Sequence, residues 1–276
     1  MSEWLELSFV QNAFAASLLA GVLCGIVGTY VVANRIAYLA GGVAHAAYGG
    51  VGLAFYLEIS PTLGILGFTM AAALLMGVLS LRERHRADTA ISVLWAFGMA
   101  LGVLLVDITP GYGADLMSYL FGSILTVSRG SLAAMAMLTL IVLPWTMLFH
   151  NELAAVSYDE SFARVRGLPV TAFYLSLVGL MALTVVVLVQ VVGLILVIAL
   201  LTIAPYIAEK RSRSLLSMMG RAVVYNVLFG MTGLCLSLAL NVTSGAAIIC
   251  VAAAGYFLSV GLDNLKKRQG LRGHHV

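Results

Sequence analysis

Long runs of apolar residues, separated by short polar stretches, recur along the whole chain. Each run has roughly the 20 residues that a helix needs to cross the hydrocarbon core of a bilayer. The nine expected spans are residues 10–33, 38–57, 62–81, 89–106, 131–149, 170–188, 190–208, 222–240 and 244–262. The division between the sixth and seventh spans rests on Gln190 and Gly193, and one long bent helix there would reduce the count from nine to eight.

The composition indicates that lipid is the natural solvent of this chain. Hydrophobic residues make up 62% of the sequence and charged residues 10%, whereas a soluble domain carries about 25% charged residues. A β-barrel would alternate apolar and polar positions, but residues 175–189 contain almost no polar side chain. We therefore predict an all-α, polytopic membrane protein. Residues 1–276 form a single transmembrane domain, in which 266–276 are a basic cytoplasmic tail.

The basic residues predict an orientation, because Lys and Arg accumulate in cytoplasmic loops. Nine spans would place 14 of the 15 basic residues on one side, and only Arg129 on the other. Eight spans would separate the basic clusters, so the charge pattern favours nine. We expect a multi-pass protein of the cell membrane, with its N-terminus outside and its C-terminus in the cytoplasm. The small net charge of +3 gives no sign of a nucleic-acid partner.

The sequence lacks the motifs of a membrane enzyme. It contains no GxxxxGK[ST] phosphate loop, no HExxH and no GxSxG. A secondary transporter coupled to protons or other ions would need carboxylates inside its spans. None of the nine predicted spans carries one at mid-membrane. We therefore predict a transport subunit without an ATPase site of its own, and keep an ion-coupled secondary transporter as the remoter alternative.

One ionisable side chain lies well inside a predicted span. His45 shares a helical face with Gly41, Gly49 and Gly52, and Gly42 flanks this face. Glycines permit close helix packing, and an intramembrane imidazole tends to face a pathway or the protein interior. Imidazole nitrogen suits zinc, iron and nickel, so His45 is a candidate ligand on an ion path. The alternative is a neutral histidine that is hydrogen-bonded to a neighbouring helix.

Charged residues mark both ends of the predicted bundle. Asp107 and Asp115 flank the outer mouth, where they are either a funnel for cations or solvated loop carboxylates. On the inner side, residues 158–168 resemble a short amphipathic helix that ends at Gly167. Residues 209–221 form a second inner segment. Both inner segments are either docking elements for a partner or ordinary basic connectors.

Five segments together resemble the metal-type ABC permeases, a family that imports manganese, zinc or iron. Their order along the chain matches the family order across nearly the whole sequence. The segments are AHAAYGGVGLAF, DLMSYLFGSIL, YDESFARVRGL, VVGLILVIALLTIAP, and GLCLSLALN with the GAA that follows it.

The resemblance implies a homodimeric permease that binds two copies of an ABC ATPase and receives metal from an external metal-binding lipoprotein. The divalent metal ion would be transported cargo, with no permanently bound cofactor. The implied ATPase-coupling residues are Tyr158, Asp159, Glu160, Phe162, Arg164, Arg166, Gly167, Glu209, Lys210 and Arg211.

The sequence departs from the family pattern at the implied metal site. The family usually has an Asp four residues before the His, where this chain has Gly41, and the closing Asp of the family pattern is Asn241 here. Loss of a carboxylate should weaken the binding of hard ions relative to zinc. Zinc or manganese is the expected cargo, with iron as a further candidate. A permease for a metal chelate, such as a siderophore or cobalamin, is the alternative.

Overall fold

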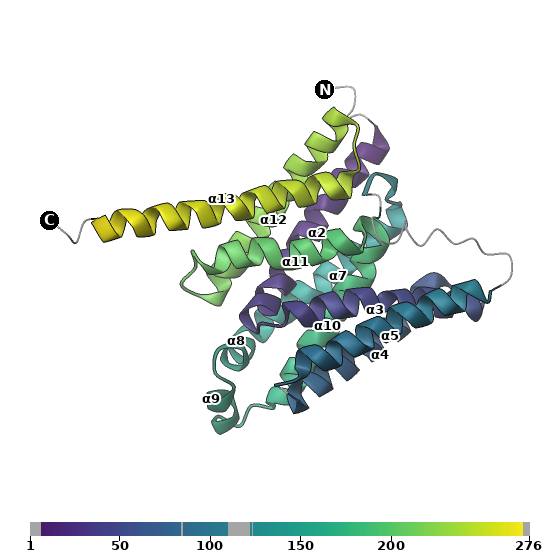
Figure 1. The fold of residues 1–276 in the computed structure, drawn as a ribbon, viewed down its shortest axis with the longest axis horizontal. Coiled ribbons are helices and arrows are strands. Elements are labelled where there is room, and N and C mark those ends of the chain that lie inside the picture. The colour runs from purple at the N-terminus through teal and green to yellow at the C-terminus, as the bar shows by residue number, and fades with distance from the viewer. Residues whose placement is uncertain (1–6, 84, 110–121, 123, 273–276) are drawn as a thin grey trace.

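The computed structural model describes residues 7–83, 85–109, 122 and 124–272, with side chains as far as residue 264. Within these residues the secondary structure is helical throughout (Figure 1). The long helices are α2 (Ser8–Ala33), α3 (Ala37–Tyr56), α4 (Pro61–Arg82), α5 (Ala87–Asp107), α7 (Arg129–Leu148), α10 (Val170–Val192), α11 (Leu194–Glu209), α12 (Leu215–Leu240) and α13 (Ser244–Arg272). The short elements are α8 (His150–Tyr158), α9 (Glu160–Val165) and the single turn η1 (Ile124–Thr126).

Each of the nine predicted spans coincides with one of the long helices of the described chain. Most ends agree within a few residues, but α12 begins at Leu215 rather than 222 and α13 continues to Arg272 rather than 262. Seven of these helices are long and apolar enough to cross a membrane: α2, α4, α5, α7, α10, α12 and the part of α13 up to Asn264. The polytopic helical fold is therefore established, and the crossing of all nine helices stays a prediction.

Neither of the two remaining long helices, α3 and α11, is both long and apolar enough to be counted as membrane-crossing, and the reasons differ. The apolar helix α11 has only 16 residues. The helix α3 is long enough, but its 20 residues include five glycines, three tyrosines and His45, and it is not among the helices that are apolar enough to cross. Most of α3 is nevertheless buried, so most of its surface meets protein. A helix covered by other helices does not need a fully apolar surface.

The boundary between the sixth and seventh predicted spans is a break at Gly193. The helix α10 ends at Val192, Gly193 has φ 82° and ψ 161°, and α11 begins at Leu194. Only glycine adopts such a backbone conformation readily. Gly122, which also has positive φ, lies against the backbone of Gly193 so closely that a Cβ at position 122 would clash. The chain therefore forms two helices here and not one bent helix.

Small residues bring the long helices of the core together. In α2, a Cβ at Gly25 would lie 2.6 Å from the Cα of Val223 in α12. In α5, a Cβ at Gly98 would lie 3.1 Å from the Cα of Ala46 in α3. The pairs Gly21/Gly25 and Gly98/Gly102 thus act as GxxxG packing faces, which is their usual role in membrane helices.

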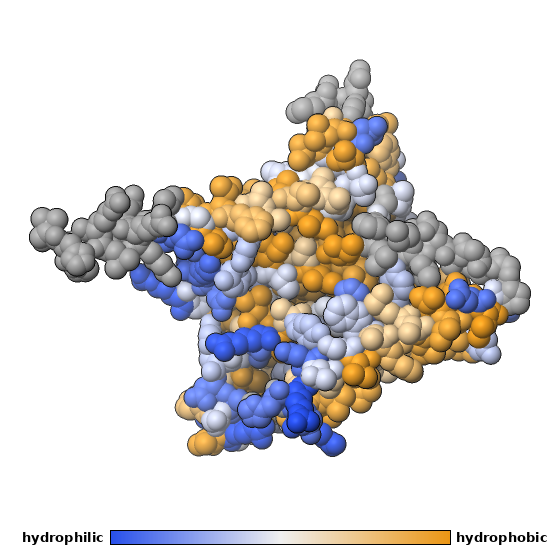
Figure 2. Space-filling model, in the orientation of Figure 1, coloured by the Kyte–Doolittle hydropathy of each residue, from blue (hydrophilic) through white to orange (hydrophobic). Residues whose placement is uncertain are grey.

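The polar surface is concentrated at one end of the bundle. Figure 2 shows hydrophilic residues gathered over α8, α9 and the turn between α11 and α12, while apolar residues cover the helices. Arg35, Ala87, Glu160 and Arg213 come from four different predicted cytoplasmic loops, and all four line one cavity at this end. The loops that were expected to share one side of the membrane are therefore neighbours in space.

Candidate functional site

The helix α3 lies between α4 and α5, and its glycines allow that position. A Cβ at Gly42 would lie 2.6 Å from Ile91 Cγ2, and a Cβ at Gly49 would lie 2.5 Å from Phe68 Cε1. At Gly52, a Cβ would clash with the backbone of Gly102. Gly41 differs from these three, because a Cβ there would meet nothing within 4 Å. The helix α3 is therefore tightly packed at Gly42, Gly49 and Gly52 and open beside Gly41.

His45 borders this open side. Its ring is half-buried, and Nδ1 lies 2.8 Å from the carbonyl oxygen of Gly41, one turn earlier in the same helix. A carbonyl oxygen can only accept a hydrogen bond, so the neutral imidazole carries its proton on Nδ1. Its lone pair is then on Nε2, which is the form of imidazole that binds a metal ion.

Side chains of α5 cover one face of the imidazole. The centroids of the His45 and Trp95 rings are 4.3 Å apart with an interplanar angle of 36°. The indole Nε1 of Trp95 donates to the Sδ of Met99 at 3.0 Å. Trp95 also meets the ring of Tyr38, with the two centroids 6.2 Å apart, and the hydroxyl of Tyr38 bonds to Ser92. His45 thus lies at the end of an aromatic row between α3 and α5.

The other predicted metal candidates are not near a formed site in the described chain. No group of three or more His, Cys, Asp or Glu side chains is close enough to hold a metal ion among the described residues. Asp107 is exposed at the last residue of α5. Asp115 lies outside the described residues. Among the described residues, His45 therefore remains a candidate ligand without a further pair of His, Cys, Asp or Glu side chains beside it to complete a metal site.

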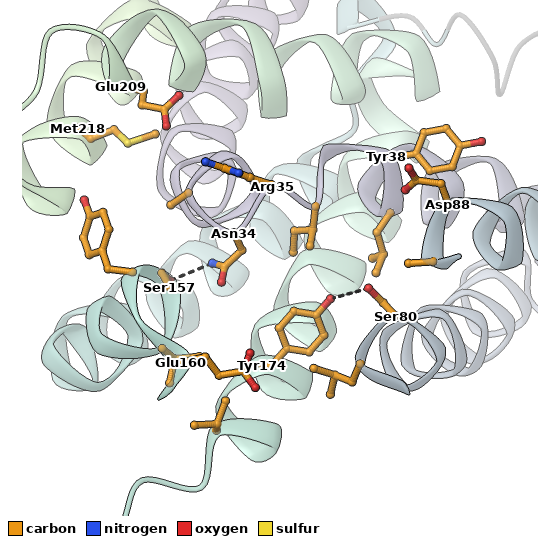
Figure 3. Close-up of a pocket in the computed structure, with 18 of the residues that line it drawn as sticks. Asn34, Arg35, Tyr38, Ser80, Asp88, Ser157, Glu160, Tyr174, Glu209 and Met218 are labelled. Atoms are coloured by element: carbon orange, nitrogen blue, oxygen red, sulfur yellow. Dashed lines mark hydrogen bonds between the residues drawn. The ribbon is translucent and has the colours of Figure 1, made fainter. Parts of the chain in front are cut away.

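A polar cavity of about 950 Å³ lies at the hydrophilic end of the bundle (Figure 3). Its wall combines the α2–α3 turn, the end of α4, the start of α5, α8, α9, the start of α10 and the α11–α12 turn. Two hydrogen bonds tie these elements together: Asn34 Nδ2 donates to Ser157 Oγ at 2.9 Å, and the hydroxyl of Tyr174 donates to Ser80 Oγ at 3.4 Å. The cavity therefore joins all the predicted coupling segments in one place.

The helix α9 is built as a short protruding element. The side chain of Asp159 accepts a hydrogen bond from the backbone N–H of Phe162 at 2.9 Å, which caps the helix N-terminus. Arg164 and Glu160 form an ion pair at 2.6 Å one turn apart, and Gly167 with φ 76° ends the segment. Phe162 is 52% and Val165 88% exposed. These two exposed apolar side chains make α9 a candidate for contact with another protein.

The second coupling segment has a connection that sequence reasoning missed. Lys210 lies 3.3 Å from the Asp263 carboxylate and 4.8 Å above the ring of Tyr206. Arg211 donates to Ser259 at 3.4 Å. Desolvation works to lower the pKa of Lys210, but the hydrogen bond to Asp263 and the nearby charges outweigh it and raise this pKa. Lys210 and Arg211 are therefore attached to α13, while Glu209 lines the cavity.

Trp95 and Tyr38 were also missed. Tyr38 precedes His45 by seven residues, and this spacing puts both on one helical face. That signal could have identified Tyr38. Trp95 is on another helix, so only the packing of α3 against α5 brings it to His45.

Comparisons with known proteins identify the family of this chain. The ABC 3 transport family matches residues 6–262. An uncharacterised membrane protein of Synechocystis is 46% identical over 94% of this chain and 92% of its own length. The manganese transport system membrane protein MntC of Halalkalibacterium halodurans is 31% identical over 92% of this chain and 87% of its own length.

A solved structure has the same fold. PsaBC from Streptococcus pneumoniae in complex with a Fab matches with a TM-score of 0.83 and 27% identity, covering 94% of this chain and 93% of that one. The family match and the structural match both extend over nearly the whole chain. The chain therefore belongs to the ABC 3 transport family.

Proposed function

We propose that this chain is the permease subunit of an ATP-driven importer for a divalent metal ion, with zinc as the first candidate. The observation that carries the proposal is His45, whose Nδ1 contact with Gly41 puts the imidazole lone pair on Nε2. It lies one turn after the open position of Gly41, in a family of transport proteins. A histidine inside a membrane bundle is costly unless it has a function or a partner.

The choice of zinc follows from the ligand that is present and the one that is missing. Imidazole nitrogen is a good ligand for zinc, whereas manganese favours carboxylate oxygen. Position 41 has no side chain, so no carboxylate stands one turn before His45. Because the relatives include manganese transport proteins, manganese is the second candidate for the cargo.

A second copy of the chain is part of the proposal. His45 is half-buried in the isolated chain, and one imidazole is too few ligands for a zinc ion. A second chain against the open side of α3 would remove His45 from lipid and bring a second imidazole to the path. Water could complete the coordination of an ion in transit.

The energy source is proposed to be a separate ABC ATPase that docks on α9 and the polar cavity beside it. The exposed Phe162 and Val165 supply apolar contact, and the ion pair between Arg164 and Glu160 stiffens the helix. Because the predicted inner loops surround one cavity, we infer nine crossings with the N-terminus outside and the C-terminus in the cytoplasm. An external metal-binding lipoprotein would deliver the ion to the opposite end.

Whole-cell uptake of radioactive zinc and manganese tests the role of His45. The His45→Ala variant should lose most zinc uptake at low metal concentration. His85→Ala is the matched control, because His85 is exposed in the loop between α4 and α5, and its uptake should equal that of the unchanged protein. Equal uptake by the His45→Ala variant, at equal amounts of protein in the membrane, would refute this metal path.

A further inference from the structure

The imidazole of His45 is held at two points. Its Nδ1 donates to the backbone of its own helix at Gly41, at 2.8 Å, and its ring face lies against Trp95, at 4.3 Å between centroids. The first contact fixes which nitrogen carries the proton. The second fixes the plane of the ring, because an imidazole that rotated about its Cβ–Cγ bond would collide with the indole. Together they leave Nε2 in one direction.

Trp95 is itself held in place. Its Nε1–H donates to Met99 Sδ on the next turn of α5, and Tyr38 packs edge-on against it. The hydroxyl of Tyr38 in turn bonds to Ser92, so the row of rings is attached to both helices. On the side of Gly41, by contrast, a Cβ would meet nothing within 4 Å. In the described chain, Trp95 is thus the ring that limits the orientation of His45.

We propose that Trp95 is a positioning residue that sets the affinity of His45 for the transported metal ion. The proposal rests on the proposed function, in which Nε2 of His45 binds the ion. Outer-shell groups that orient a metal-binding histidine through hydrogen bonds typically contribute 10–100-fold to metal affinity or activity. We expect a ring that fixes the same imidazole to have an effect at the lower end of that range. An indole face adds an electrostatic effect, because an imidazole that binds a divalent cation becomes more positive and is attracted to a neighbouring π system.

Substitution of Trp95 in the complete transporter tests this. The initial rate of zinc uptake is measured against zinc concentration for the Trp95→Leu and Trp95→Phe variants. Leucine fills space without a π face, and phenylalanine keeps an aromatic face. Trp95→Leu should raise the apparent KM about 10-fold or more with a maximal rate within about 2-fold. Trp95→Phe should restore the KM to within about 3-fold, which space-filling alone would not achieve.

A matched control is Trp145 of α7, which is also partly buried and packs against Phe149 at 5.5 Å. Trp145→Leu should leave the apparent KM for zinc unchanged. Equal KM values for Trp95→Leu and the unchanged protein would overturn the proposal. So would equal KM values for Trp95→Leu and Trp95→Phe, because the aromatic face would then have no role.

A double substitution separates this proposal from the proposed function. If Trp95 acts through His45, then adding Trp95→Leu to His45→Ala should change the apparent KM no further. A further rise in the double variant would show a role independent of His45 and overturn the positioning role. If His45→Ala alone keeps a normal KM, the metal path itself fails. If His45→Ala raises the KM and Trp95→Leu does not, only the positioning role fails.

Discussion

Nδ1 of His45 lies 2.8 Å from the carbonyl oxygen of Gly41. This contact links the proposed metal ligand to position 41, where the metal-type ABC permeases that the sequence resembles usually have an Asp. The backbone of residue 41 orients the imidazole, while the absence of a side chain there leaves the space beside it open. The chain thus combines a fixed imidazole with an unoccupied neighbouring position.

Restoring a carboxylate at position 41 should change the metal preference. Gly41→Asp places its side chain in open space, since a Cβ at this position meets nothing within 4 Å. An added carboxylate favours manganese. Manganese should compete with radioactive zinc at a roughly tenfold lower concentration than in the unchanged protein, a difference of about 1.4 kcal/mol.

The control for this change is Gly41→Asn, which has the same shape without the charge. It should leave the competition between the two metals close to that of the unchanged protein. An equal shift for the Asn and Asp variants would mean that the charge is not the cause and would contradict the account of position 41.

Packing at Gly52 should be intolerant of even one methyl group. A Cβ at this position clashes with the backbone of Gly102, which cannot move as a flexible side chain can. Gly52→Ala should lower the free energy of unfolding by about 1–3 kcal/mol, visible as a lower melting temperature of the detergent-solubilised protein. Gly67→Ala in α4 is the control, because a Cβ there meets nothing within 4 Å, and it should not destabilise.

The Lys210–Asp263 pair should matter for transport more than for folding. It joins the α11–α12 turn to α13, and both side chains are partly exposed, so little stability depends on it. The Lys210→Glu variant should keep its melting temperature but lose ATP-dependent uptake, and adding Asp263→Lys should recover part of it. If Lys210→Glu loses uptake and the double variant does not recover it, the contact between Lys210 and Asp263 is not what transport requires.

The same pair should persist at physiological pH. A folded-state pKa above the usual 10.5 means that the ammonium is favoured by folding. This contribution is complete below the unfolded pKa and disappears only as the pH rises through the higher folded value. Uptake by the unchanged protein should therefore show no loss attributable to Lys210 between pH 6 and about pH 9. If uptake by the unchanged protein fell between pH 6 and about pH 9, and uptake by the Lys210→Arg variant did not, this prediction would be wrong.

The exposed apolar side chains of α9 should be required for binding the ATPase. Phe162→Asp puts a charge on a surface that we propose to be covered by the ATPase, so the purified permease should no longer retain this subunit. Phe257→Ala is the control, because Phe257 of α13 is 70% exposed on a helix long and apolar enough to span the membrane. If the Phe162→Asp variant retained the ATPase, the docking surface would have to lie elsewhere on the permease.

The sequence predicted the helices well because membrane spans require long apolar runs. The break at Gly193 was visible as a glycine three residues after Gln190 in an otherwise apolar run. The sequence could not predict contacts between helices far apart in the chain. The stacking of Trp95 on His45 and the pairing of Lys210 with Asp263 depend on how α3 meets α5 and how α11 meets α13.

The most direct test of the account is transport by purified components. The permease and its ATPase are reconstituted in lipid vesicles, and ATP-dependent movement of radioactive zinc is measured for the unchanged protein and the His45→Ala variant. The account predicts movement that needs both ATP and the ATPase and that falls sharply without His45. Zinc pumping by the permease alone, or an unchanged KM in the His45→Ala variant, would contradict it.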